Sequence, residues 1–434
     1  MPTATLLTLG CKVNQYESRG MVESLVKAGY VLAPQGQAAD LTVINTCTVT
    51  QKADLETRAL VRRAHRTNPL GRCVVVGCYA QVRPEELKDL PGVILILGQE
   101  YKHEFLRFLP QEKPKSGPVV KVSVLRPENG VPPLGFPGFD RTRAFFRIQD
   151  GCSAWCTYCI VPLARGPSRS MSLSRVIEGL KAYEKAGYTE VVLSGTHLGA
   201  WGLDLATPNS LAGLLNRLEK ESFGLRLRLS SVEPHEVTPQ LIETIRRFPH
   251  FCPHLHLPLQ SGDDEVLNRM HRPYSSDFFK NLVFSLTADW PELCLGADVM
   301  VGFPGEDEQA FLKTRDLVSS LPLAYLHVFP YSKRPRTLAA RMPGQVDIKE
   351  IKRRAALLRE VGRAKRLAFY QRHQRQVRPV LIENTRDRET GLTRGLTDNY
   401  IQVLMTDASL PAGEIRPVRL TELGPGNRMF GHFV

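Results

Sequence analysis

The sequence predicts an α/β protein in three parts: an open parallel sheet with crossover helices, then a partial barrel of six strand-helix units, then a small antiparallel β-barrel. Two observations predict the first two parts. Short apolar runs alternate with segments of helical periodicity, and this strand-helix unit recurs through most of the chain. A third observation, five strand-like runs separated by turns after Gln376, predicts the last part. The expected boundaries are residues 1–112, a linker at 113–139, then 140–370 and 371–434.

Four apolar runs in the first part have the length of buried parallel strands, and a helical pattern follows each run. Strands are expected at residues 5–9, 41–44, 73–76 and 93–97. Helices are expected at residues 14–28, 52–66, 84–90 and 102–109. This alternation is typical of a parallel sheet covered by crossover helices.

Three cysteines occupy equivalent places in these units, since Cys11, Cys47 and Cys78 each stand just past a predicted strand. The carboxyl ends of parallel strands open onto one crevice, so we expect these thiols to be neighbours. Iron-sulfur clusters are normally held by four cysteines, and a group of three leaves one iron free. The pattern therefore predicts a cluster with an open position. Three other cysteines fit buried packing better: Cys73, Cys252 and Cys294.

Residues 110–137 are rich in proline and glycine, which neither a helix nor a central strand tolerates. The stretch predicts a connection between domains, with one strand at residues 119–124. The first domain is therefore expected to end near residue 112.

Strand-helix alternation resumes after the linker, and six units can be counted. Strands are expected at residues 145–148, 190–193, 226–229, 254–259, 295–301 and 324–329. Helices are expected at residues 172–186, 211–220, 239–247, 277–288 and 307–320. Six units are too few for a closed eight-unit barrel, so we expect a barrel open on one side, which would admit a large substrate.

Three more cysteines, Cys152, Cys156 and Cys159, form a C-x3-C-x2-C loop at the exit of the first barrel strand. Their thiolates can converge on one point, and again one metal position is left open. A zinc site completed by a distant histidine such as His235 or His254 is the alternative, as is a set of unconnected cysteines. His254 and His256 alternate on one strand and face the same way, which favours packing inside the barrel over metal ligation.

Residues 349–378 carry many arginines and lysines on a helical pattern with one apolar face. A solvated helix packed on the barrel, a helix facing phosphates and a helix on a membrane surface are all compatible with this pattern, although its apolar face is poor in aromatic residues. The strand-like runs of the last part are at residues 377–382, 392–396, 400–405, 415–423 and 429–434.

Composition favours a protein that binds a polyanion and argues against a membrane-spanning or secreted one. The chain has 434 residues, a net charge of +13 and a pI near 9.4, which favours a polyanionic partner such as RNA. It has no apolar stretch long enough to cross a bilayer and no signal-peptide pattern, so we expect a cytoplasmic protein without membrane contact. Nine cysteines in a reducing compartment indicate ligands or buried thiols rather than disulfides.

The cysteine loop, with an aromatic residue just before its last cysteine, resembles the signature of the radical S-adenosylmethionine enzymes. The resemblance implies that Cys152, Cys156 and Cys159 are catalytic and hold a 4Fe-4S cluster, whose open iron binds the amino and carboxylate groups of S-adenosylmethionine. Strand-end residues of the barrel are then expected to hold the rest of that cofactor, although a polar residue at a strand end also serves as a helix cap. The expected cofactor contacts are Tyr158, Ile160, Gly195, Thr196, Ser231, Glu233, Gln260, Asp298 and Phe303.

Arg165 and Arg169 follow the loop, and each is a candidate for the cofactor carboxylate, for an RNA phosphate or for an ordinary salt bridge.

Three blocks of the first part, at residues 10–17, 45–49 and 77–81, are similar to those of the methylthiotransferases. This similarity implies a second 4Fe-4S cluster on Cys11, Cys47 and Cys78, which delivers sulfur. The last part resembles the TRAM module, an RNA-binding barrel of the OB type. The RNA contacts expected there are Arg394, Asn399, Tyr400 and Arg416, with a place in the core as the equal alternative for Tyr400.

The family resemblance is closest to bacterial tRNA methylthiotransferases that act at C2 of N6-threonylcarbamoyladenosine 37. It implies a monomer that binds the anticodon stem-loop of tRNA and receives electrons from a donor protein. Two alternatives keep the chemistry and change the substrate, to N6-isopentenyladenosine 37 or to an aspartate of a ribosomal protein. A third is a non-catalytic RNA-binding zinc protein.

Overall fold

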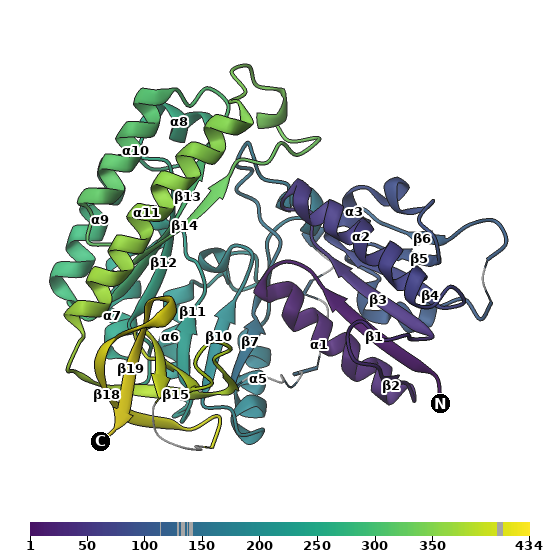
Figure 1. Cartoon of the computed structure of the whole chain (residues 1–434), viewed down its shortest axis with the longest axis horizontal. Helices are drawn as coiled ribbons and strands as arrows, with labels where there is room; N and C mark the ends of the chain where they lie inside the picture. The colour runs from purple at the N-terminus through teal and green to yellow at the C-terminus, as the bar shows by residue number, and fades with distance from the viewer. Residues whose placement is uncertain (113, 128–129, 132–134, 137, 139–141, 406–410) are drawn as a thin grey trace.

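The computed structural model describes residues 1–434 apart from 113, 128–129, 132–134, 137, 139–141 and 406–410. Figure 1 shows a sheet with its helices at the amino end beside a larger curved array of strands and helices, with a small β-barrel packed at one end of that array. Helix α1 lies between the first sheet and the strand that opens the central array. None of the described helices is long and apolar enough to cross a membrane.

The first sheet has six strands, all parallel, in the order β2-β1-β3-β4-β5-β6. Its strands are β1 (Thr3–Thr8), β2 (Val31–Leu32), β3 (Leu41–Thr46), β4 (Arg72–Gly77), β5 (Val93–Leu97) and β6 (Val119–Lys121). Residues of β3, β4 and β5 are almost all buried, as expected of strands covered on both faces. Strand β6 falls in the predicted linker, so this stretch provides an edge strand of the first sheet.

Helices α1 (Lys12–Lys27) and α2 (Gln51–Thr67) follow the prediction closely. The expected helices at 84–90 and 102–109 are 3-10 segments, η1 (Pro84–Leu87) and η2 (Lys102–Phe108). Non-helical torsion angles at Glu104 interrupt the second of these, which explains why no regular α-helix forms there. A short helix that the sequence did not predict, α3 (Cys78–Val82), begins at the third cysteine.

The central part has two parallel three-stranded sheets, β7-β10-β11 and β12-β13-β14. Backbone hydrogen bonds join them, since Leu227 N donates to His250 O and Cys252 N donates to Leu227 O. The six strands therefore form one curved array, with β7 and β14 as unpaired edges within the described chain, and the prediction of a partial barrel is confirmed. Its strands are β7 (Arg143–Arg147), β10 (Glu190–Ser194), β11 (Arg226–Leu229), β12 (His254–Gln260), β13 (Cys294–Val301) and β14 (Tyr325–Pro330).

Helices cover the outer face of this array, and their buried residues form one apolar core with the strands. Five match the prediction within two residues: α5 (Leu173–Lys185), α6 (Leu211–Glu219), α7 (Pro239–Arg247), α9 (Ser276–Asp289) and α10 (Glu308–Ser320). Side-chain caps set several starts; the Thr238 hydroxyl, for example, accepts from Leu241 N before Pro239 begins α7. Two short helices, α4 (Val161–Arg165) and α8 (Asp264–Arg269), and a hairpin, β8 (Gln149–Asp150) with β9 (Arg169–Ser170), were not predicted.

Helix α11 (Ile348–Arg372) packs along β14 and leads into the last part. That part is a closed five-stranded barrel in the order β15-β16-β17-β19-β18, as predicted, with β17 and β19 parallel. Its strands are β15 (Val377–Arg386), β16 (Thr393–Thr397), β17 (Gln402–Met405), β18 (Ile415–Gly424) and β19 (Arg428–Phe433). Its core continues into the central part, because Cys294, Tyr325 and Phe369 belong to the same buried cluster.

Candidate active site

All three parts of the chain line one cavity of about 600 Å³. Cys11, Cys47 and Cys78 line it from the first sheet, polar strand ends line it from the barrel, and Tyr400 lines it from the last part. Figure 1 shows why these segments meet, since the first domain stands beside β7, an unpaired edge of the barrel. The cavity therefore lies inside the partial barrel and is partly open to solvent.

Local backbone geometry brings the first three cysteines to this cavity. Cys11 precedes α1, Cys47 follows β3, and Cys78 begins α3. Gly10 has φ +100°, and a Cβ there would stand 2.8 Å from the Cβ of Cys47, so a larger residue would push two of the cysteines apart. Gly77 also has positive φ and packs against Asn45 and Thr46. Both glycines allow the tight turns that direct the thiols inward.

Hydrogen-bond donors surround these sulfur atoms. Val49 N lies 3.5 Å from Sγ of Cys47, and Nε2 of Gln99 donates to Sγ of Cys78 over 3.2 Å. Burial, followed by the proximity of Cys78, raises the pKa of the Cys47 thiol to about 12. A bare thiolate is thus unfavourable here, and a metal centre would supply the missing positive charge.

The second cysteine loop has its own donors. Arg272 donates from Nη1 to Sγ of Cys156 over 3.3 Å and is ion-paired with Glu233, and Nδ1 of His197 lies 3.5 Å from Sγ of Cys152. Burial raises the pKa of Cys159 to about 12. A second cavity of about 600 Å³ opens beside this loop, and Cys156, Glu233 and Arg272 are among its lining residues. Glu233 lines both cavities, so the two spaces adjoin there.

Neither cysteine triad has the geometry of a single-ion site. Within the described ranges, only one group of three or more His, Cys, Asp or Glu ligand atoms lies within 4.8 Å of one another, and it contains no cysteine. Zn–S bonds of about 2.3 Å require sulfur atoms about 3.8 Å apart. N–H donors to sulfur are also a feature of iron-sulfur sites. The described side chains therefore do not form the compact set that a single zinc ion requires.

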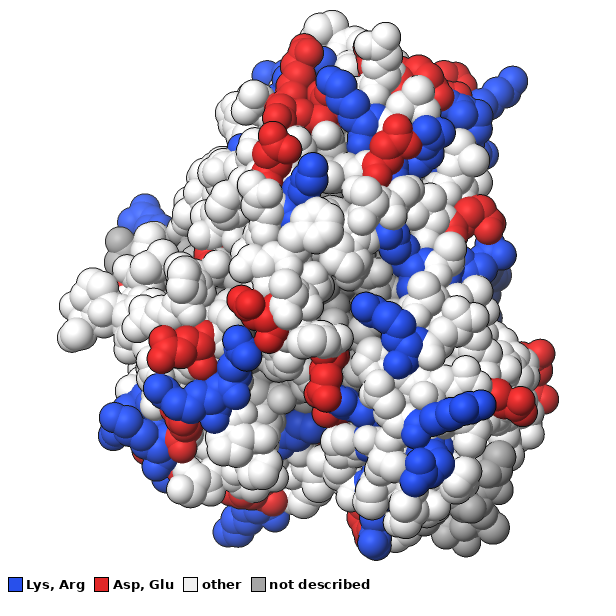
Figure 2. Space-filling model, turned by 90° about the vertical axis from the view of Figure 1, so that its left-hand side faces the viewer, with Lys and Arg blue, Asp and Glu red and all other residues white. Residues whose placement is uncertain are grey.

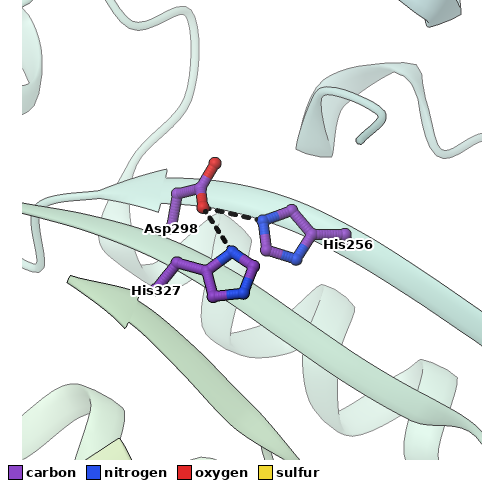
Figure 3. A group of neighbouring side chains, drawn as sticks. All are labelled: His256, Asp298 and His327. Carbon is purple, nitrogen blue, oxygen red and sulfur yellow. Dashed lines mark hydrogen bonds and ion pairs between the residues drawn. The ribbon is translucent and has the colours of Figure 1, made fainter. Parts of the chain in front are cut away.

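That one compact group consists of His256, Asp298 and His327 on three neighbouring strands (Figure 3). Oδ1 of Asp298 lies 2.8 Å from Nε2 of His256 and 3.4 Å from Nδ1 of His327, and Nδ1 of His256 lies 3.0 Å from the hydroxyl of Tyr325. Burial by itself raises the pKa of Asp298. His256 and His327 have the larger combined effect and hold the pKa below its usual range. Hydrogen bonds thus satisfy both nitrogens of His256 without an ion, in agreement with the interior packing expected for it.

Most of the predicted cofactor contacts lie on the main cavity. Seven of them line it: Ile160, Gly195, Thr196, Ser231, Glu233, Gln260 and Asp298. Tyr158 and Phe303 do not; their rings meet at 6.5 Å between centroids in a neighbouring apolar cluster, where Phe303 is completely buried. Gln260 has φ +68°, a left-handed conformation that is uncommon outside glycine and that aims the end of β12 at the cavity.

A buried carboxylate ties the two cysteine regions together. Glu17 of α1 accepts from Nη1 of Arg147 over 2.8 Å and lies 3.1 Å from Nη2 of Arg165, which stands at the end of α4. Lys102 donates to the same carboxylate over 2.6 Å, and Arg165 also donates to Asp150 over 2.7 Å. Three roles were open for Arg165: binding the cofactor carboxylate, binding an RNA phosphate, or forming a salt bridge within the protein. The structure shows the salt bridge.

Arg169 also pairs internally, with Asp150 at 3.5 Å and with the carbonyl oxygens of Gly130 and Arg165.

The cavity wall near Tyr400 carries an excess of positive charge that the sequence analysis missed. Lys12 lines the cavity, with Nζ 6.0 Å from the ring centre of Phe145. Burial, followed by the charges of Arg143 and Arg228, lowers the pKa of Lys12 to about 8. Arg228 stands 5.2 Å from the ring centre of Tyr400. Position next to Cys11 was the only sequence signal that could have singled out Lys12.

The four predicted RNA contacts have different environments. Arg416 is exposed beside Glu414, and Arg394 is about one-third exposed near Glu383. Asn399 is completely buried; its side chain binds Thr397 and the carbonyl of Glu292, so it is not available to RNA. Tyr400 stacks on His254 with 4.2 Å between ring centres and lines the cavity.

Comparisons with known proteins agree with this arrangement. Residues 3–98 match the family model described as uncharacterized protein family UPF0004, and residues 146–318 match the radical SAM superfamily. The chain is 38% identical to the threonylcarbamoyladenosine tRNA methylthiotransferase MtaB of Bacillus subtilis (strain 168), over 100% of this chain and 97% of that protein. It is 31% identical to a tRNA-2-methylthio-N(6)-dimethylallyladenosine synthase of Desulfitobacterium hafniense (strain Y51), over 93% and 94%.

Among solved structures, the radical S-adenosylmethionine methyltransferase TsrM of Kitasatospora setae is similar in fold, with a TM-score of 0.53 and 15% identity over 78% of this chain and 77% of that one. The family resemblance and the fold class expected from the sequence are both confirmed. The chain belongs to the methylthiotransferase family of radical S-adenosylmethionine enzymes.

Proposed function

We propose that this enzyme inserts a methylthio group at C2 of N6-threonylcarbamoyladenosine 37 in tRNA. The relatives named for that substrate are 34–38% identical over 88% or more of the chain in four species. The observation that carries the proposal is the single cavity in which Cys11, Cys47 and Cys78 face the strand ends of the barrel. A sulfur centre and a radical source must reach the same carbon atom, and Cys156 of the second triad lines the other cavity, which adjoins this one at Glu233.

Two 4Fe-4S clusters and S-adenosylmethionine fit the donor sets of the chain. Cys152, Cys156 and Cys159 would hold one cluster and Cys11, Cys47 and Cys78 the other. When bound, these groups supply the electron, the carbon radical and the sulfur, which acid-base side chains cannot. Arg272 and Gln99, through their N–H donors to sulfur, would stabilise the charge of the ligated thiolates.

The strand-end residues Ser231, Gln260 and Glu233 would orient the nucleoside part of S-adenosylmethionine by hydrogen bonds. Glu233 is held by Arg272, so its carboxylate has a fixed direction at the boundary of the two cavities. The mostly apolar surface of the cavity would limit the access of water to the radical. The proposed division of the chain remains residues 1–112, 140–370 and 371–434 with the linker between them.

The proposed RNA partner is the anticodon stem-loop, because position 37 lies there. The protein would act as a cytoplasmic monomer that receives electrons from a donor protein. Figure 2 shows that basic and acidic side chains alternate over the face it displays, so that face has no continuous basic patch. Arg394 and Arg416 on the last barrel are proposed to contact phosphates. Asn399 is not proposed as an RNA contact, because its side chain is buried.

Paired cysteine variants test the proposal. In anaerobically purified protein, about eight irons per chain are expected for wild type and about four for Cys78→Ala or Cys152→Ala. Cys152→Ala should lose S-adenosylmethionine cleavage, whereas Cys78→Ala should keep cleavage and lose product. Colourless zinc-containing wild type would contradict the proposal, and so would a methylthiolated dimethylallyl nucleoside as the product in nucleoside mass spectrometry.

A further inference from the structure

The cavity holds an ammonium group without a counterion. Nζ of Lys12 makes no hydrogen bond or ion pair with any described residue, and its ring contact with Phe145 is distant. The hydroxyl of Tyr400 likewise makes no hydrogen bond within the described chain. Both side chains line the same cavity. Two donors thus face the cavity without a hydrogen-bond acceptor among the described residues.

The neighbouring carboxylates are already committed to other cations. Glu190, a carboxylate that acts electrostatically on Lys12, is ion-paired with Arg226, with Arg228 at 2.9 Å and with Arg143 at 3.9 Å. Asp298 accepts from His256 and His327. Arg228 has a buried Nη1 without a hydrogen-bond partner, and its guanidinium stands against the Tyr400 ring. This end of the cavity therefore has positive potential and free donors.

We propose that Lys12 and the hydroxyl of Tyr400 bind the threonyl carboxylate of the substrate nucleoside. This inference rests on the proposed function, since that nucleoside carries a free carboxylate on N6 and the dimethylallyl nucleoside carries an apolar group there. A carboxylate would supply the acceptor that the ammonium lacks, in a cavity where charge-assisted hydrogen bonds are strong. An apolar substituent would leave the ammonium desolvated and unpaired, so the same contact would select against it.

The contact would also orient the base. Lys12 follows Cys11 directly, so a substituent anchored on its side chain is held close to the sulfur-bearing residues. The carbon to be modified would then be presented to Cys11, Cys47 and Cys78 in one position rather than in many. Lys12 acts here as a specificity residue of the substrate pocket.

The test is a cycle of two proteins and two RNAs. Anticodon stem-loops carry either the threonylcarbamoyl carboxylate or its neutral carboxamide, and anaerobic holoenzyme is titrated with each in a fluorescence binding assay. Wild type is expected to bind the carboxylate form roughly 10- to 100-fold more tightly, the range of a hydrogen bond to a charged group. Lys12→Gln should lose this preference, and Lys12→Arg should keep most of it.

Tyr400→Phe removes only the hydroxyl and should reduce the preference roughly threefold to tenfold. Lys27→Gln, which removes the same charge from the exposed far end of α1, is the matched control and should keep the full preference. Iron content of each variant checks that the cysteine region is intact.

An equal preference in wild type and Lys12→Gln overturns the inference while leaving the proposed function standing, provided that wild type still methylthiolates the carboxylate stem-loop. If wild type modifies only the dimethylallyl stem-loop, the proposed function and the inference both fail.

Discussion

Replacing Glu17 by Gln would test how the first domain is joined to the barrel. The Glu17 side chain is completely buried among Arg147, Arg165 and Lys102, which approach its oxygen atoms at 2.8, 3.1 and 2.6 Å. Burial raises its pKa, but Arg165, Lys102 and Arg147 outweigh burial and hold the pKa well below the usual range, so the carboxylate is charged at neutral pH. The substitution leaves three buried cations with Asp150 as their remaining acid. Removing one member of a buried ion pair costs about 3–5 kcal/mol.

The assay is urea unfolding of anaerobic protein followed by tyrosine fluorescence and by the visible absorbance of the iron sites. With an m-value of roughly 2 kcal/mol/M, the first transition should move to lower urea by about 2 M. Glu104→Gln is the matched control, because Glu104 is 63% exposed and pairs with Arg107 on the surface; its midpoint should change little. Midpoints that agree between the two variants would refute the view that Glu17 joins the two domains.

Three further predictions concern pH, cysteine roles and RNA binding. Burial raises the pKa of Asp150, but Arg165 and Arg147 lower it to about 2, so its stabilisation is complete above about pH 4 and is lost as pH falls toward about 2. In a plot of urea midpoint against pH, Asp150→Asn should therefore reduce the fall between about pH 4 and about pH 2. The same fall in wild type and Asp150→Asn would show that Asp150 does not cause it. Cys73→Ala and Cys294→Ala should keep the iron content of wild type, because both thiols are buried in strands away from the main cavity. An iron content as low as that expected of Cys78→Ala would show that the replaced cysteine is a ligand. Affinity for tRNA should fall with salt at a log-log slope of roughly −0.7 to −0.9 per phosphate contact, and a flat response would exclude phosphate recognition.

The fold could be predicted from the sequence because its signals are local and repeated. The barrel strands are short segments in which apolar residues are continuous or alternate with polar ones, and each long helix shows periodicity over several turns. The errors have the same physical origin. Helices α4 and α8 have five and six residues, too few for a period to be recognised, and β2 has only two. Pairing of β6 with β5 depends on a long-range contact that local composition does not encode.

The candidate site was only partly accessible from sequence. Cys11, Cys47 and Cys78 could be grouped because parallel strands end at one edge, and all three line the cavity; their role as ligands stays a prediction. Glu17 looks like an ordinary helix residue, and its partners lie 85, 130 and 148 residues away. Tyr400 was expected either as an RNA contact or in the core; it has φ +70°, stacks on His254 and lines the cavity, which sequence alone does not predict.

One set of buried contacts holds the two cysteine regions close to each other. Glu17 stands six residues after Cys11, and Arg165 stands six residues after Cys159. Their ion pair therefore joins α1, which follows the first cysteine of one triad, to α4, which follows the last cysteine of the other. Asn14, on the same turns of α1, accepts from Arg165 and donates to the carbonyl oxygens of Leu9 and Thr46, beside the first two cysteines. Because these contacts are buried and charged, the two triads cannot separate without exposing them, and the distance between them is fixed by α1 and α4 rather than by the linker.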